Sequence, residues 1–212
     1  HLSTRRQRQM CIRDRHHTAK KRENQYEWIL QQAQERDWYV DTIVCPPNKI
    51  DNAVYGQGLN LLEVELFASI LNRHNESMSA PWTITLDACD VNEQRFTNRI
   101  SERLNEWPVL DSTLDSEHKA DANHRIVGGA SIVAKVVRDR IMEALQDGLG
   151  FNIGSGYPSD PNTVAALPKL IGPEEIHPEL RWSWATVERY WTKHYDTPVP
   201  RRKPTGTTLF SM

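Results

Sequence analysis

The longest regular pattern of apolar and polar positions in the chain predicts one amphipathic helix from about residue 119 to about residue 145. Apolar residues recur at spacings of three and four, which places on one helical face Ile126, Ala130, Val133, Val137, Ile141 and Leu145. Asp121 falls in the first turn, where the helix dipole favours an acidic side chain. Gly128 and Gly129 each cost about 1 kcal/mol relative to alanine, so we expect another backbone or a ligand to approach closely there.

Shorter helices are expected on both sides of this segment. They cover residues 20–35, 60–72 and 163–170, with a further helix after residue 93 that carries Phe96, Ile100 and Leu104. Thr18 can cap the first of them through its side-chain oxygen. Asp90 and Glu93 form an Asp-x-x-Glu pattern that is typical of a capping box, so Asp90 is expected to cap the helix that follows it.

Aromatic residues gather between residues 180 and 195, and two interpretations are open for them. They are Trp182, Trp184, Tyr190 and Trp191. Their helical spacing favours a stripe that faces the core, which is the interpretation we prefer. The alternative is a platform on which nucleic-acid bases stack.

Segments rich in β-forming residues predict strands over residues 38–44, 82–87 and 108–114. The second is the clearest, because it is short and β-branched and ends in Asp87. Since strands alternate with helices, the pattern predicts an α/β fold with a layered sheet. In such folds, acids at strand ends and helix starts converge on one edge of the sheet, as Asp87 and Asp121 would.

Composition and charge narrow the class of protein. The formal net charge of −2 does not indicate nucleic-acid binding, so any phosphate contacts must come from local basic clusters. No apolar run approaches the length of a membrane span. Cys11, Cys45 and Cys89 show neither metal-ligand spacing nor a disulfide framework, so we expect reduced thiols and a cytoplasmic location. We also expect a monomer without a membrane partner.

The two ends of the chain differ from its middle. Residues 1–17 are rich in Arg, Gln and His without apolar periodicity, and they read as translated adapter sequence; the alternative is a basic arm that binds nucleic acid. Residues 197–212 are rich in Pro, Arg and Thr, which predicts a disordered tail. The expected folded domain therefore covers residues 18–196.

Several motifs stand in order in the second half of the chain. They are Lys119-Ala120-Asp121, Ala130 to Val136 (Ala-Ser-Ile-Val-Ala-Lys-Val), Arg138-Asp139-Arg140, and Gly154 to Pro161 (Gly-Ser-Gly-Tyr-Pro-Ser-Asp-Pro). Their order and spacing resemble ribonuclease HII, above all its archaeal branch, from about Thr18 to about Tyr195. The resemblance implies a ribonuclease H-like fold with a central mixed sheet flanked by helices. The family opens with a strand that bears an Asp-Glu pair and a Gly-Arg-Gly turn; this sequence does not contain it, so we expect the N-terminal strand to be missing.

The resemblance implies an endonuclease that cuts the RNA strand of RNA–DNA hybrids, including single ribonucleotides in duplex DNA. Phosphodiester hydrolysis of this kind uses two divalent ions about 3.5–4 Å apart, which activate water and stabilise the leaving oxygen. Mg²⁺ prefers oxygen ligands, and Mn²⁺ is the expected substitute. Asp87 and Asp121 match the positions of the family's metal-binding aspartates, so we expect them to be the catalytic residues.

Other residues of these motifs have expected roles as well. The resemblance implies that Tyr157 packs against sugar at the RNA–DNA junction, which suits an aromatic face and a hydroxyl group. Ser155 and Lys135 are further candidates for substrate contact. Asp139, between two arginines, is expected to form a structural salt bridge.

Two alternatives to this function remain open from the sequence. Without the first acidic pair, the chain could bind hybrids and not cleave them. It could also be another nuclease of the ribonuclease H-like superfamily, although the Gly-Tyr-Pro-Ser-Asp loop argues against this.

The last residues of the chain suggest a protein partner. Leu209 and Phe210 are large apolar residues in a basic tail, and they resemble a sliding-clamp-binding peptide. Gly206 and Met212 depart from that pattern, and contact of the basic tail with nucleic acid is the alternative.

Overall fold

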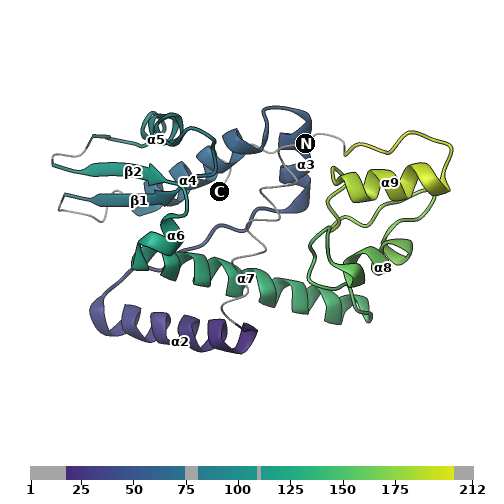
Figure 1. The fold of residues 1–212 in the computed structure, drawn as a ribbon, viewed down its shortest axis with the longest axis horizontal. Helices are drawn as coiled ribbons and strands as arrows, with labels where there is room; N and C mark the ends of the chain where they lie inside the picture. The colour runs from purple at the N-terminus through teal and green to yellow at the C-terminus, as the bar shows by residue number, and fades with distance from the viewer. Residues whose placement is uncertain (1–17, 75–80, 109–110, 203–212) are drawn as a thin grey trace.

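The computed structural model describes residues 18–74, 81–108 and 111–202, in which two strands and the helix between them lie between groups of helices (Figure 1). In order, the elements are α2 Ala19–Arg36, α3 Pro47–Tyr55, α4 Leu59–His74, β1 Thr83–Asp87, α5 Glu93–Ser101, β2 Thr113–Glu117, α6 Ala120–Asn123, α7 Arg125–Leu149, α8 Pro161–Leu170 and α9 Ala185–His194. The predicted α/β class is confirmed. The expectations for residues 1–17 and 203–212 lie outside the described residues. No helix in the described ranges is long and apolar enough to cross a membrane.

β1 and β2 form a parallel two-stranded sheet, and α5 belongs to the connection between them. Parallel strands need such a crossover because the chain must return to the same end of the sheet. Ile84 and Leu86 alternate with more exposed residues and turn into the core, as expected for a strand with one buried face. The register places Asp87 opposite Glu117 at the carboxyl ends of the two strands. Both acidic residues therefore lie at the same end of the sheet.

The part of the chain that the structure describes has two apolar cores. The first lies between the sheet, α4 and α5, and its buried residues are Val64, Ile84, Leu86, Phe96, Ile100 and Leu114. The second lies around α8 and α9, and its buried residues are Ile153, Ala166, Leu167, Leu170, Ile171, Ile176, Leu180, Val187 and Trp191. Figure 1 shows α7 running from α6, near the sheet, toward α8. Trp182, Trp184 and Tyr190 pack against the second core, so the core interpretation of these aromatics is confirmed.

Charged pairs hold α2 along α7. Arg22 of α2 lies 2.8 Å from the carboxylate of Asp139, and Arg140 pairs with Glu23 one residue further along both helices. The predicted salt bridge of Asp139 is confirmed. Thr18 accepts a hydrogen bond from the third residue after it and caps α2, also as predicted.

Three predicted elements need correction, and the first is the strand over residues 38–44. This segment has no regular secondary structure, and Trp38, Tyr39 and Val44 are 48%, 62% and 58% exposed. Its composition favours a strand, but that preference depends on packing against a paired neighbour, and no described strand pairs with it.

The strand expected over residues 108–114 is β2, which starts at Thr113. α3 was not predicted, although Pro47 at its first position is a helix-start signal.

The single long helix predicted from residue 119 is two helices. α6 ends at His124, whose extended backbone (φ −116°, ψ 121°) separates it from α7. The predicted apolar face is also rotated, because Ile126 is 80% exposed and Ile141 is 43% exposed. The buried residues of α7 are Val127, Val133 and Val136. Apolar residues occupy more than one face of α7, and its neighbours decide which face is covered.

Asp51 anchors the far end of the described chain. Its fully buried carboxylate accepts hydrogen bonds from the backbone N–H groups of Trp182 and Ser183, each at 3.0 Å. It also pairs with Arg202 at 2.8 Å. The chain is thus held to the fold as far as Arg202, whereas the division into a domain over 18–196 and a tail stays a prediction.

Candidate active site

Asp87 is the last residue of β1, and its carboxylate is held by the start of α6. Oδ1 accepts a hydrogen bond of 3.0 Å from the N–H of Ala120, and the N–H of Lys119 is a further donor. Both donors belong to the turn that joins β2 to α6. The end of one strand is thereby tied to the segment that follows the other.

Asp121 lies in the first turn of α6, directly after the fully buried Ala120. Two features of the backbone fix its position. Lys119 has φ 68°, the left-handed conformation that is uncommon for a residue other than glycine. Gly128 of α7 lies against the backbone of Asp121, as the glycine pair led us to expect. Asp121 is therefore held from both sides.

The negative charge of Asp121 affects the ionisation of Asp87. Burial raises the pKa of Asp87, and the negative charge of Asp121 raises it further. The N–H groups of Ala120 and Lys119 and the ring of His118 lower it in part. Two like charges in a partly dry site oppose joint ionisation, and a cation between them would favour it.

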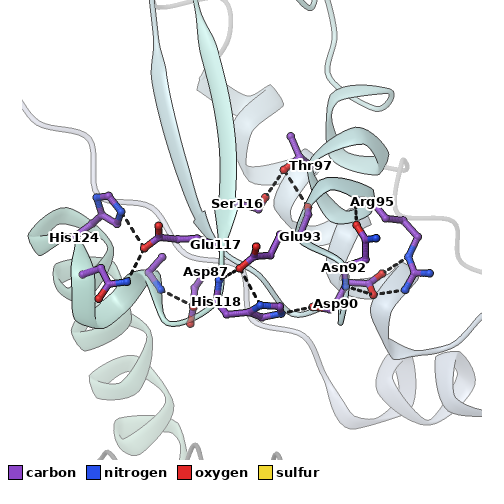
Figure 2. Close-up of polar contacts among 12 residues, drawn as sticks. Asp87, Asp90, Asn92, Glu93, Arg95, Thr97, Ser116, Glu117, His118 and His124 are labelled. Atoms are coloured by element: carbon purple, nitrogen blue, oxygen red, sulfur yellow. Dashed lines mark hydrogen bonds and ion pairs between the residues drawn. The ribbon is translucent and has the colours of Figure 1, made fainter.

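Paired polar groups lie on both sides of Asp87 (Figure 2). Glu117, at the end of β2, contacts His124 at 3.1 Å and the side-chain amide of Asn123 at 2.9 Å. On the other side, His118 contacts Glu93 at 2.8 Å. These groups are already engaged with one another.

Glu63 and Cys89 are neighbours of the site that the sequence did not reveal. Burial raises the pKa of the Glu63 carboxyl and of the Cys89 thiol, which share a hydrogen bond. The Cys89 sulfur also lies 3.7 Å from the carbonyl oxygen of Asp87. The one available signal was an acid between Leu62 and Val64, two residues that face the core.

Asp87 and Asp121 supply part of an oxygen shell for a metal ion. In the described ranges, no three His, Cys, Asp or Glu side chains converge on one point that could hold a metal. Mg²⁺ is often held by only one or two carboxylates, with water and substrate phosphate as the other ligands. The donor chemistry therefore fits a hard cation.

The loop over residues 154–160 is fixed by its own hydrogen bonds. Asp160 accepts from the N–H and the hydroxyl of Ser155 at 2.6 and 2.7 Å, which lowers the pKa of Asp160. Thr163 accepts from the N–H of Gly156 at 3.0 Å. Gly154 has φ 68°, and a Cβ there would lie 2.6 Å from the N atom of Thr163, so this turn requires glycine. The Ser155 hydroxyl is used inside the loop, and its contact with substrate stays a prediction.

Tyr157 is in the loop between α7 and α8, and its ring packs against α7 away from the acids. The guanidinium carbon of Arg138 is 4.1 Å from the centre of its ring. Arg138 is about 20 Å along α7 from the first residue of that helix, whereas Asp121 precedes the helix start. Lys135 is half-buried on α7 between these points. The structure thus brings Asp87 and Asp121 together and places Tyr157 and Lys135 further along the same helix.

The prediction that Asp90 caps α5 is wrong. The N-cap is Asn92, whose side chain accepts from the N–H of Arg95 at 2.7 Å. The Asp90 side chain is 1% exposed and pairs with Arg95 and Arg99. Its hydrogen bond with Arg95 lowers the pKa of Asp90 to about 2. Asp90 and Asn92 both have side-chain oxygens near the start of α5, and Asn92 forms the N-cap.

Comparisons with known proteins agree with the motifs. A family model described as Ribonuclease HII matches residues 15–187. A protein named Ribonuclease HII from Methanococcus maripaludis (strain C6) is 41% identical over 151 residues, which cover 69% of this chain and 60% of that protein. One of the same name from Methanococcus vannielii is 35% identical over 179 residues, covering 84% and 70%. The chain thus spans 60% to 70% of the length of these relatives.

Two solved structures resemble the fold. The ribonuclease H2 from Pyrococcus horikoshii OT3 has a TM-score of 0.67 at 32% identity, covering 84% of this chain and 78% of that one. A chain from the PCNA:RNase HII complex of Archaeoglobus fulgidus has a TM-score of 0.60 at 27% identity, covering 76% and 73%.

Proposed function

The chain belongs to the ribonuclease HII family, and from that membership we propose that it hydrolyses the RNA strand of RNA–DNA hybrids, including single ribonucleotides in duplex DNA. The observation that supports the proposal is the contact at the end of β1, where Asp87 accepts the N–H of Ala120 and feels the charge of the next residue, Asp121. Binding without cleavage is not favoured, since the matched family is one of nucleases.

Asp87 and Asp121 would hold Mg²⁺ or Mn²⁺. Their oxygen ligands suit these ions. Burial and, after it, the negative charge of Asp121 raise the pKa of Asp87, and a bound cation would favour the ionised carboxylate against both effects. A pair of divalent ions supplies Lewis-acid stabilisation and an activated water for phosphodiester hydrolysis. The part played by the protein is orientation, because the N–H of Ala120 fixes the Asp87 carboxylate and α6 fixes Asp121.

Tyr157 and Arg138 would contact the substrate along α7. The Tyr157 ring can stack on a sugar or base, and its hydroxyl can form a hydrogen bond with a ribose 2′-OH. Arg138, stacked on that ring, and Lys135 supply positive charge for phosphate groups. α7 would thereby align the nucleic acid between the loop and the acids.

The test is cleavage of a DNA duplex with one ribonucleotide, in Mg²⁺ or Mn²⁺, with EDTA as the metal-free control. Asp87→Asn and Asp121→Asn should each lower turnover more than about a hundredfold, since even residues that only support a metal ligand contribute about 10–100-fold. Asp139→Asn is the matched control, because that acid pairs with Arg22 and Arg138 and not with the metal-binding acids, so the change should act mainly on stability. Asp121→Asn within tenfold of wild type would contradict the metal assignment.

A sliding clamp is the proposed protein partner. The Archaeoglobus fulgidus relative is described as a complex with PCNA. In this chain we assign the contact to Leu209 and Phe210, which lie outside the described residues. An apolar pair of this kind can act as an anchor in a clamp pocket.

A further inference from the structure

We propose that His118 is a positioning residue: it fixes the turn that holds the carboxylate of Asp87 and leads into Asp121. The proposal rests on the function proposed above, because it gives His118 its role through the two acids. His118 lies between the last residue of β2 and the left-handed Lys119.

Three contacts of His118 join separate segments of the chain (Figure 2). Nδ1 lies 2.8 Å from Oε1 of Glu93, which also accepts the backbone N–H of His118 at 2.6 Å. Nε2 lies 2.7 Å from the carbonyl oxygen of Asp90. Each ring nitrogen therefore faces an oxygen atom that can accept a hydrogen bond. The ring thus connects the turn after β2 with α5 and with the loop after β1.

The conformation of the next residue explains why this connection matters. Lys119 is left-handed, which is sterically disfavoured for a side chain other than glycine. Such a conformation persists only where the surroundings impose it. His118 holds one side of Lys119, and the bond from Ala120 to Asp87 holds the other. Loss of the His118 contacts would let the turn relax and would move the N–H groups of Lys119 and Ala120 away from Asp87.

The exposure of the pair separates this role from general stabilisation. The side chains of His118 and Glu93 are 41% and 43% exposed. Exposed ion pairs add little to the stability of a protein. Loss of His118 should therefore disturb the turn while leaving both cores intact.

The test compares His118→Ala with His194→Ala in the full chain. His194 is a matched control, because it is an exposed histidine whose ring contacts a backbone carbonyl, that of Tyr190 at 2.8 Å, on the distant α9. Amide hydrogen exchange reports on the Ala120 N–H without metal, and titration with Mn²⁺, followed by electron paramagnetic resonance, reports on the acids. For His118→Ala we expect about tenfold faster exchange at Ala120 and about tenfold weaker Mn²⁺ binding. Melting temperature and exchange at the buried Ile100 and Leu167, one from each core, should match wild type, and His194→Ala should change none of these.

Unchanged Ala120 exchange in His118→Ala would overturn the proposal. Equal acceleration at Ala120 and at either Ile100 or Leu167 would also overturn it, because His118 would then stabilise a core and not the turn alone. If wild type binds no Mn²⁺, the proposed function fails, and the exchange at Ala120 still decides whether His118 holds the turn.

Discussion

Gly128 lies so close to Asp121 that a Cβ atom at position 128 would be 2.9 Å from the Asp121 carbonyl oxygen. Real Cβ atoms essentially never come so near, so a side chain here must move the backbone of Asp121. The next glycine differs. A Cβ at Gly129 would meet only the end of the Ile29 side chain at 3.7 Å, which is an ordinary contact.

Gly128→Ala should therefore reduce both stability and cleavage. Overpacking of this kind costs about 1–3 kcal/mol, and the displaced Asp121 should lower turnover as well. Gly129→Ala is the control and should be neutral or stabilising by up to about 1 kcal/mol. Thermal unfolding and cleavage assays of both variants check this; equal effects of the two substitutions would contradict it.

Tyr157→Ala should impair cleavage more than folding. Its ring stacks on Arg138 in a loop that is held by Asp160 and Thr163, so the loop keeps its shape without the ring. Loss of a stacking partner costs about 1–3 kcal/mol, which predicts a loss of about tenfold on a single-ribonucleotide duplex. Tyr157→Phe keeps the ring and tests the hydroxyl. A large fall in melting temperature with normal cleavage would show that the residue is structural.

Asp90 should make stability depend on pH in acid. Its pKa is lowered from 3.8 to about 2 by Arg95, so its contribution is complete above about pH 4 and is lost as the pH falls through about 2. Asp90→Asn should be less stable than wild type at pH 7, and the difference should shrink toward pH 2. Melting temperatures between pH 7 and pH 2 measure this, with Asp115→Asn, an exposed position, as control. A difference that stays constant down to pH 2 would contradict the pairing.

A peptide of residues 201–212 should bind a sliding clamp in the micromolar range, about −8 kcal/mol. Calorimetric titration into an archaeal clamp measures the affinity. A peptide with both Leu209→Ala and Phe210→Ala is the control, because it removes the apolar anchors and keeps the basic residues. Equal heats from the two peptides would show that charge alone drives the contact.

Local patterns predicted the elements that depend on local interactions. β1, α5 and α8 combine a clear period with a boundary signal, and the structure has all three. Elements that depend on distant partners were not predictable. Residues 38–44 have strand composition without a described partner strand. The break at His124 left no trace in the apolar spacing of the α7 sequence.

The candidate site shows the same division. The meeting of Asp87 and Asp121 could be expected, because acids at a strand end and a helix start share one edge of such a sheet. The position of Glu63 could not, since only the packing of α4 in the folded chain brings its carboxyl to the Cys89 thiol. Tyr157 belongs to the same set of motifs, yet α7 places it away from the acids.

The two apolar cores share no buried residue, and this has a consequence for unfolding. Each core can act as a separate cooperative unit, with its own free energy of opening. Native-state hydrogen exchange should then sort the slow amides into two groups, one around Phe96 and Ile100 and one around Leu167 and Val187. α7 packs against the second core through Met142, Leu145 and Leu149 and also contacts β1, so the exchange of its amides would show which unit opens first.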